Sequence, residues 1–203
     1  MHFLSHALGL AVSIAGAVVL QASAMQHGLQ TQIACAVYAI SLVSMFLSSA
    51  AYHAVPARKV RMRQIFRALD HCAILVLIAG TYTAFALTAL HGVLGHALLV
   101  AMWALCGTGI YRIGARRDAE RGPVVFALVM GWLALVAAPE LAGSLGSRGT
   151  LFFLAGGALY TLGVPFYVWR RLPHHHGVWH LFVLAGSLSH FLAIAWFAVP
   201  RGG

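Results

Sequence analysis

Four ionisable residues lie near the ends of long apolar segments in this chain: His53, Asp70, His176 and His180. Ionisable groups at such places are costly, so they are candidates for function. His176 and His180 are spaced i, i+4, and on a helix both imidazoles would therefore point from one face, as two ligands of one metal do. This pair together with a third histidine supports the hypothesis of a metal site.

A site of this kind predicts hydrolytic chemistry. Three protein nitrogens with water in the fourth position are typical of catalytic zinc, which activates the water and polarises a carbonyl. Asp70 would then hold or deprotonate the water, and Ser49, one turn from His53 on the same helix face, would steady the substrate oxygen. Since the site would open among membrane helices, we expect a lipid amide or ester as the substrate.

Each of these residues also has a purely structural interpretation. A buried histidine is often only a hydrogen-bonded contact between helices. Asp70 could pair with Arg67 one turn away, and Ser49 could bond back to the carbonyl of Met45, as serine often does in membrane helices.

The composition defines the class of protein in which these residues lie. Of 203 residues, 61% are hydrophobic and 8% are charged, and the mean hydropathy is +0.86. A soluble surface needs roughly 25–35% charged residues, so we predict an integral membrane protein. In such a protein the net charge of +9 is interpreted from where the basic residues lie along the chain, because they set the membrane orientation. We therefore expect no nucleic-acid partner.

Seven apolar segments of about 20 residues follow one another, and each is long enough to cross a hydrocarbon core of ~30 Å as a helix. They lack the alternation of a membrane barrel, so we predict an all-α bundle of seven transmembrane helices. No linker or soluble domain is visible, and residues 1–203 are predicted to form one domain. The approximate spans are 3–23, 31–54, 69–89, 93–112, 123–142, 149–170 and 176–199.

The basic residues predict the orientation of these spans. Most of the 13 Lys and Arg residues fall in the connections after the second, fourth and sixth spans, whereas the odd-numbered connections hold only Arg148 and Arg201 lies beyond the last span. By the positive-inside rule the N-terminus is cytoplasmic and the C-terminus is outside. The first segment could be a cleaved signal peptide, but without a basic leader we expect it to remain as a span. The basic residues of the even connections are Arg58, Lys59, Arg61, Arg63, Arg67, Arg112, Arg116, Arg117, Arg121, Arg170 and Arg171.

This topology brings the candidate residues to one depth. The second span ends inside at His53, the third starts inside near Asp70, and the seventh starts inside at His176. His6, at the inner end of the first span, could reach the surroundings of the site. His190 lies ten residues past His180, about 15 Å along the helix, and is expected to be a hydrogen-bonded interior group.

Several separated motifs, in order along most of the chain, resemble the hemolysin III family of the progestin and adipoQ receptor superfamily, which includes the adiponectin receptors. The motifs are SHALG at 5–9, the SSAAYH run that contains Ser49 and His53, LDHCAILVLIAGTYTAF with Asp70, and the stretch from HGVWH to SLSHF.

The resemblance implies a seven-helix bundle with zinc near its cytoplasmic side. It carries the ligand roles to His53, His176 and His180, with Asp70 reached through water and Ser49 close by. We therefore expect a zinc protein of the inner (plasma) membrane, a ceramidase-like hydrolase of a lipid amide or ester. The alternatives are a non-catalytic lipid-sensing receptor with a structural zinc and, with least support, a membrane-lytic protein.

Overall fold

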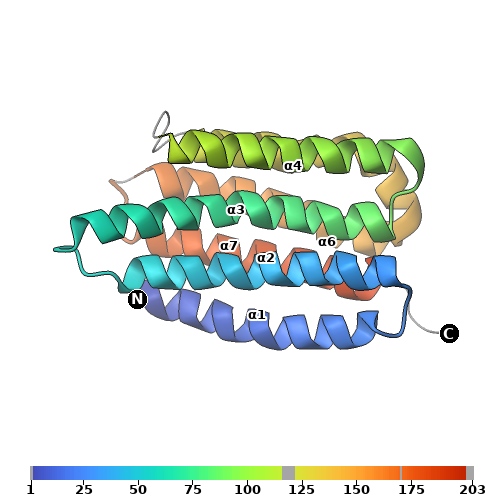
Figure 1. The fold of residues 1–203 in the computed structure, drawn as a ribbon, viewed down its shortest axis with the longest axis horizontal. Coiled ribbons are helices and arrows are strands. Elements are labelled where there is room, and N and C mark those ends of the chain that lie inside the picture. The colour runs from blue at the N-terminus through green and yellow to red at the C-terminus, as the bar shows by residue number, and fades with distance from the viewer. Residues whose placement is uncertain (1, 116–121, 170, 200–203) are drawn as a thin grey trace.

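The computed structural model describes residues 2–115, 122–169 and 171–199, and within these ranges the regular structure is helical, without strands (Figure 1). Arg116, Arg117, Arg121, Arg170 and Arg201, on which part of the orientation argument rests, lie outside the described residues. The helices are α1 (His2–Ala24), α2 (Leu29–Ala54), α3 (Val60–Thr88), α4 (Gly92–Gly114), α5 (Gly122–Leu133), the 3₁₀ turn η1 (Ala134–Ala137), α6 (Ala138–Val168), α7 (His175–Ala193) and the π-helical η2 (Ile194–Ala198).

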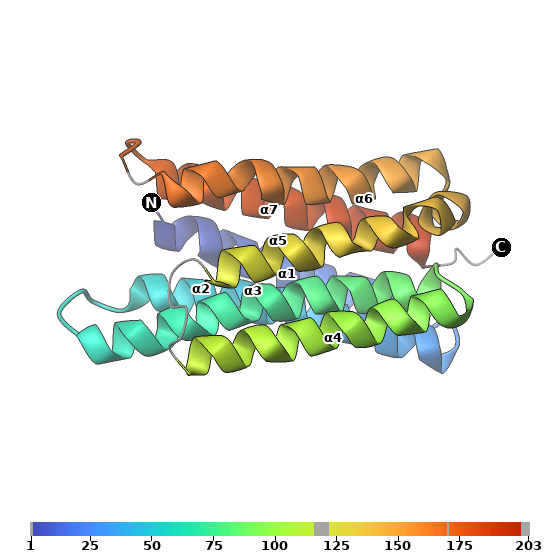
Figure 2. The same ribbon diagram turned by 90° about the horizontal axis from the view of Figure 1, so that it is seen from above.

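Six helical segments of the described chain are long and apolar enough to cross a membrane, which agrees with an all-α membrane protein. One of them, Gly122–Val168, has 47 residues. A straight helix of that length would measure about 70 Å, more than twice the hydrocarbon core. The chain instead turns: Figure 2 shows it running out along α5 and returning along α6.

The turn begins earlier than the sequence suggests. Helix α5 ends at Leu133, well before the expected end of the fifth span at 142. Pro139 occupies the start of α6, where its missing N–H costs nothing, and Gly146 takes a left-handed φ of 65° that breaks the regular helix. The expected sixth span, from 149, begins just after this break.

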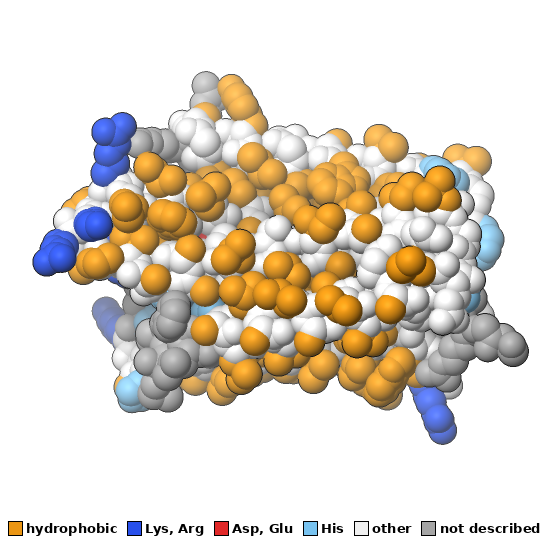
Figure 3. Space-filling model, turned by 60° about the horizontal axis from the view of Figure 1, so that its bottom comes forward, with side chains coloured by type: hydrophobic (Ala, Val, Ile, Leu, Met, Phe, Trp, Pro, Cys, Tyr) orange, Lys and Arg blue, Asp and Glu red, His pale blue; other side chains and the backbone are white. Residues whose placement is uncertain are grey.

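Helix α3 is longer than the apolar segment that predicted it. It begins at Val60 rather than near residue 69, so its first turns carry Arg61, Arg63 and Arg67, three of the basic residues that follow α2. Arg and Lys are good helix formers, but hydropathy marks only the apolar part of such a helix. Figure 3 shows Lys and Arg side chains gathered at this end of the molecule.

The outer surface of the bundle is apolar. Large hydrophobic side chains of several helices are more than half exposed, including Val18 at 66%, Ile40 at 67% and Val100 at 70%, and Figure 3 shows such residues over the length of one face. In water this surface would be strongly unfavourable, whereas hydrocarbon solvates it. The described chain is that of a multi-pass membrane protein.

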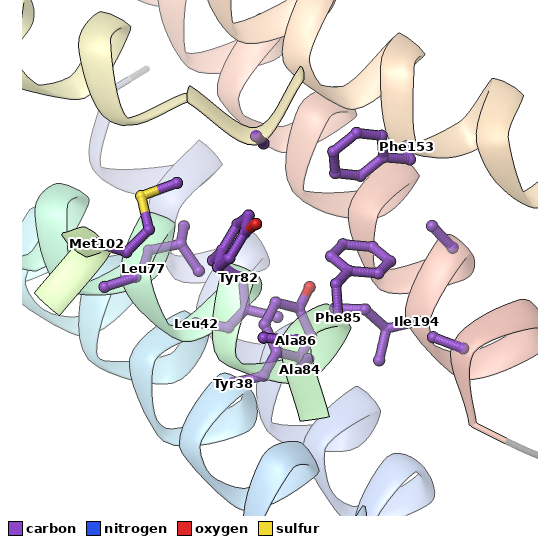
Figure 4. Packing of buried hydrophobic residues seen from close by; sticks show 14 of the residues in the cluster. Tyr38, Leu42, Leu77, Tyr82, Ala84, Phe85, Ala86, Met102, Phe153 and Ile194 are labelled. Carbon is purple, nitrogen blue, oxygen red and sulfur yellow. The ribbon is translucent and has the colours of Figure 1, made fainter. Parts of the chain in front are cut away.

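The interior is packed around α3, the most buried of the candidate spans. In Figure 4, Phe85 of α3 packs edge-on against Phe153 of α6, with ring centroids 5.0 Å apart. Tyr38 of α2, Met102 of α4 and Ile194 of η2 complete this part of the core. These contacts fix α2, α4, α6 and η2 relative to one central helix.

Small residues bring α6 and the last helix together. A Cβ at Gly156 would overlap the ring of His190, and one at Gly163 would lie 2.8 Å from Trp179 Cε3. Glycine lets membrane helices approach this closely. The contact sets the position of α7, the helix that carries two of the candidate ligands.

Candidate metal centre

The candidate residues lie at the end of the bundle that contains the α2–α3 connection (Figure 1). His53 is in the last turn of α2, and His176 and His180 are in the first two turns of α7. Helix α2 ends here because Pro56 follows, which disfavours helical backbone in the residue before it. His174 adopts a left-handed φ of 59° just before α7, and the helix starts from this turn.

The three histidines predicted as ligands meet. The Nε2 atoms of His53 and His176 are 3.3 Å apart. The ring centroids of His176 and His180 are 4.4 Å apart, and those of His53 and His180 are 5.0 Å apart. Two helices that are distant in sequence therefore place three imidazoles side by side.

A fourth imidazole, that of His6 at the start of α1, belongs to the same cluster. Its ring centroid is 3.9 Å from that of His180 and 5.4 Å from that of His53. The possible ligand atoms of His6, His53 and His180 all lie within 4.8 Å of one another. The sequence analysis placed His6 near the site but not among the ligands. The feature that could have indicated its place in the cluster was its position at the inner end of the first span.

Asp70 and Ser49 adjoin this cluster. The Ser49 side chain is hydrogen-bonded to the Asp70 carboxylate, and its Oγ lies 3.2 Å from Nε2 of His6. The neighbouring Ser48 is the residue that bonds back to the carbonyl of Met45, at 3.0 Å. The two residues predicted for catalysis are thus joined to each other and, through Ser49, to the histidines.

Other histidines have different surroundings. His71 Nε2 lies 3.1 Å from the Tyr167 hydroxyl, and His190 Nε2 lies 3.1 Å from the carbonyl oxygen of Phe153. The expectation that His190 is a hydrogen-bonded interior group is confirmed. His175 Nδ1 lies 2.8 Å from the carbonyl oxygen of Phe166 in the last turn of α6, where carbonyl groups commonly find partners outside the helix.

The donor set suits a transition metal. Zinc binds imidazole nitrogen at about 2.0–2.1 Å, so two nitrogens of a tetrahedral site lie about 3.3–3.4 Å apart. The separation of 3.3 Å between His53 and His176 already matches this spacing. His180 is only 1% exposed, so a metal here would be shielded from bulk water. The cluster could hold a metal ion.

A mostly apolar cavity of about 150 Å³ lies between α3, α5, α6 and α7. His71 and Trp179, which are the sequence neighbours of Asp70 and His180, belong to its wall, and Tyr82 and His190 lie deeper along the same helices. From His71 to Tyr82 the helix rises about 16 Å. The four clustered histidines do not line the cavity, so it approaches the cluster from the side of α3 and α7.

An apolar helical exterior and a partly buried histidine cluster at one end of the bundle define the class: a multi-pass membrane protein with a candidate metal centre. The profile of the family described as Haemolysin-III related matches residues 1–191. The chain belongs to this family, which confirms the resemblance seen in its motifs.

Named relatives agree with this assignment. The chain is 38% identical to Hemolysin-3 of Bacillus cereus over 199 residues, which cover 97% of this chain and 90% of the relative. It is also 38% identical to the Hemolysin-3 homolog of Bacillus subtilis (strain 168), with 97% and 92% covered. The human monocyte to macrophage differentiation factor is 25% identical over 195 residues, with 94% and 80% covered.

Proposed function

We propose that this protein is a zinc-dependent hydrolase that cleaves an amide or ester bond of a membrane lipid. The observation that carries the proposal is the convergence of His53, His176 and His180, with two Nε2 atoms only 3.3 Å apart. Imidazole suits several transition metals, and zinc is the usual choice for hydrolysis. When bound, zinc activates water as a nucleophile and polarises a carbonyl.

The residues around the histidines would supply the remaining chemistry. Asp70 is the carboxylate proposed to hold the attacking water and accept its proton. Ser49 is proposed to steady the substrate oxygen, and its bond to Asp70 supports a further role in positioning that carboxylate. The apolar cavity beside the cluster suits an extended hydrocarbon chain, which supports a lipid as the substrate.

We further propose seven spans, with α5 and α6 as the fifth and sixth, a cytoplasmic N-terminus and an outside C-terminus in the inner membrane. The reversal between α5 and α6 and the length of the 47-residue segment support the count. The gathering of basic side chains at the α2–α3 end supports the orientation, because such residues stay in the cytoplasm.

The test is fatty-acid release from vesicles that contain a ceramide or a lipid ester. Purified, zinc-loaded protein should release fatty acid, a chelator should stop the release, and added zinc should restore it. His180→Ala should lower the rate by at least about 10-fold, because losing a ligand should cost no less than losing a residue that supports one. The matched control is His96→Ala, since His96 is exposed on α4 and bonds to the carbonyl of Gly92 in its own helix.

One observation favours a second candidate, a lipid-sensing receptor with a structural zinc. Structural sites are usually closed by four protein ligands, and His6 adds a fourth imidazole to the cluster. If zinc-loaded protein releases no fatty acid from amides or esters, the hydrolase proposal is wrong. If this inactive protein still melts at a much lower temperature after zinc removal, the hypothesis of a receptor with a structural zinc replaces it.

A further inference from the structure

Tyr82 of α3 carries a hydroxyl group that is buried within the bundle. The Tyr82 side chain is only 3% exposed, and its hydroxyl has no hydrogen-bond partner among the described residues. Buried tyrosine hydroxyls usually find a partner, because an unpaired polar group in an apolar environment is costly. This hydroxyl is therefore a candidate to bind a group that enters the bundle.

The Tyr82 side chain belongs to the wall of the apolar cavity between α3, α5, α6 and α7. In Figure 4 it extends from α3 between Met102 and Phe85. The residues labelled around it there that also line the cavity are apolar: Leu77, Phe85, Met102 and Phe153. A molecule in this part of the cavity would meet a hydroxyl group in otherwise apolar surroundings.

Other polar groups of the cavity wall are already paired. The Tyr160 hydroxyl lies 2.7 Å from that of Ser187, and the Thr81 hydroxyl donates to the carbonyl of Leu77 at 2.7 Å. Among the described residues of this wall, the Tyr82 hydroxyl is the one buried side-chain polar group without a partner. It is the group of the wall that can form a new hydrogen bond without breaking an existing one.

The depth of Tyr82 indicates which part of a lipid it would contact. The reaction proposed above takes place beside Asp70, and Tyr82 lies about 18 Å farther along α3. Helical side chains lean toward the N-terminus of their helix, which for α3 is the end with the histidine cluster. With the scissile bond at the cluster, the Tyr82 hydroxyl would face the half of an extended acyl chain that is distal to its carbonyl.

We propose that Tyr82 selects lipids whose acyl chain carries a hydroxyl or keto oxygen in this distal half. The inference rests on the proposed lipid substrate and names its chemical class. A plain chain would leave the Tyr82 hydroxyl unpaired, whereas an oxygen on the chain would accept its hydrogen. A site that hydrogen-bonds a ligand oxygen discriminates against the analogue that lacks it.

The test measures how well fatty acids displace a fluorescent fatty acid from the purified full-length protein in detergent. The competitors are stearic acid and two hydroxystearic acids, one with its hydroxyl beside the carboxyl group and one with it in the distal half. Tyr82→Phe should bind the distal isomer about 2- to 10-fold more weakly than the wild type does, the effect of one hydrogen bond. It should bind the other two acids no more weakly. Each acid partitions into detergent equally with either protein, so the comparison isolates the tyrosine hydroxyl.

Tyr38→Phe is the matched control. Tyr38 is 1% exposed and its hydroxyl also has no hydrogen-bond partner among the described residues, but Tyr38 does not line the cavity. This substitution should leave the affinity for all three acids unchanged. A loss for the distal isomer as large as that in Tyr82→Phe would show that removing any buried hydroxyl has this effect, and would refute the inference.

The outcomes separate this inference from the function proposed above. In Tyr82→Phe, an equal change for all three acids, or none for any, overturns the role of Tyr82 and leaves the hydrolase proposal in place. If Tyr82→Phe does not fold, the wild type decides: tighter binding of the distal isomer than of the other hydroxystearic acid supports the inference, and any other order refutes it. Protein that binds none of the acids also refutes it, and fatty-acid release from vesicles then tests the hydrolase proposal independently.

Discussion

The contact between Gly156 of α6 and the His190 ring offers a sharp test of how α7 is held. In Gly156→Ala the new methyl group would overlap Cδ2 and Nε2 of the imidazole. That ring has little freedom, because Nε2 lies 3.1 Å from the carbonyl of Phe153 and the ring stacks on Phe153 with centroids 5.9 Å apart. Either the helices separate or the ring turns and loses its hydrogen bond.

The expected cost follows from these two alternatives. Forcing an extra methyl group into a packed interface costs about 1–3 kcal/mol. Leaving a buried polar group unsatisfied, the alternative outcome, also costs ~1–3 kcal/mol. We therefore expect Gly156→Ala to lower the free energy of unfolding by about 1–3 kcal/mol by either route.

Gly157→Ala is the matched control, because a methyl group there meets nothing within 4 Å. Both substitutions gain the same helix propensity, so the difference between them isolates the overlap with His190. Thermal unfolding in detergent should place the Tm of Gly156→Ala at least about 2 °C below that of Gly157→Ala.

A double substitution identifies the cause. On a His190→Ala background the ring is gone, and adding Gly156→Ala should then change the Tm very little. Equal melting temperatures for Gly156→Ala and Gly157→Ala, or an undiminished loss on the His190→Ala background, would refute the packing argument. The zinc affinity of the same variants is a second quantity to compare, because His190 lies on α7 together with two of the proposed ligands.

Three other predictions follow from the contacts. Chelation of a bound metal should lower the Tm, since a ligand at 100 times its Kd stabilises the folded state by about 2.7 kcal/mol; His53→Ala should melt at the same temperature with or without chelator. Tyr160→Phe removes the 2.7 Å bond to Ser187 between α6 and α7 and should cost about 0.6 kcal/mol, at most ~1.7, in unfolding assays. Glu140→Ala removes the acceptor of the His91 backbone N–H and should cost about 0.5–1.5 kcal/mol, with faster amide exchange at His91; unchanged exchange would contradict this contact.

Much of the molecule could be predicted from composition and spacing. The apolar segments predicted helices, because a backbone in hydrocarbon must satisfy its own hydrogen bonds. His176 and His180 share a helix face by their i, i+4 spacing, and their rings lie side by side in the structure. Equal depth at the ends of two spans made His53 a candidate to lie beside them.

Helix ends were less predictable. Hydropathy gave the apolar core of α3 but not its basic first turns. It treated the segment from 123 to 142 as one span, whereas α5 ends at Leu133 and η1 follows. Local turns within an apolar stretch depend on how the chain packs at the bundle end, and the composition of the stretch does not record that.

What the sequence determined by itself is the class of protein, its helices and the depth of each polar residue, because these follow from local periodicity and from the cost of placing charge in hydrocarbon. What only the tertiary structure decided is which residues at one depth face each other. His6, His53 and His71 all lie near the same end of the bundle, yet His6 joins the cluster while His71 turns to Tyr167. That choice depends on the rotation of each helix about its axis, which is set by close contacts such as that of Gly156 with His190.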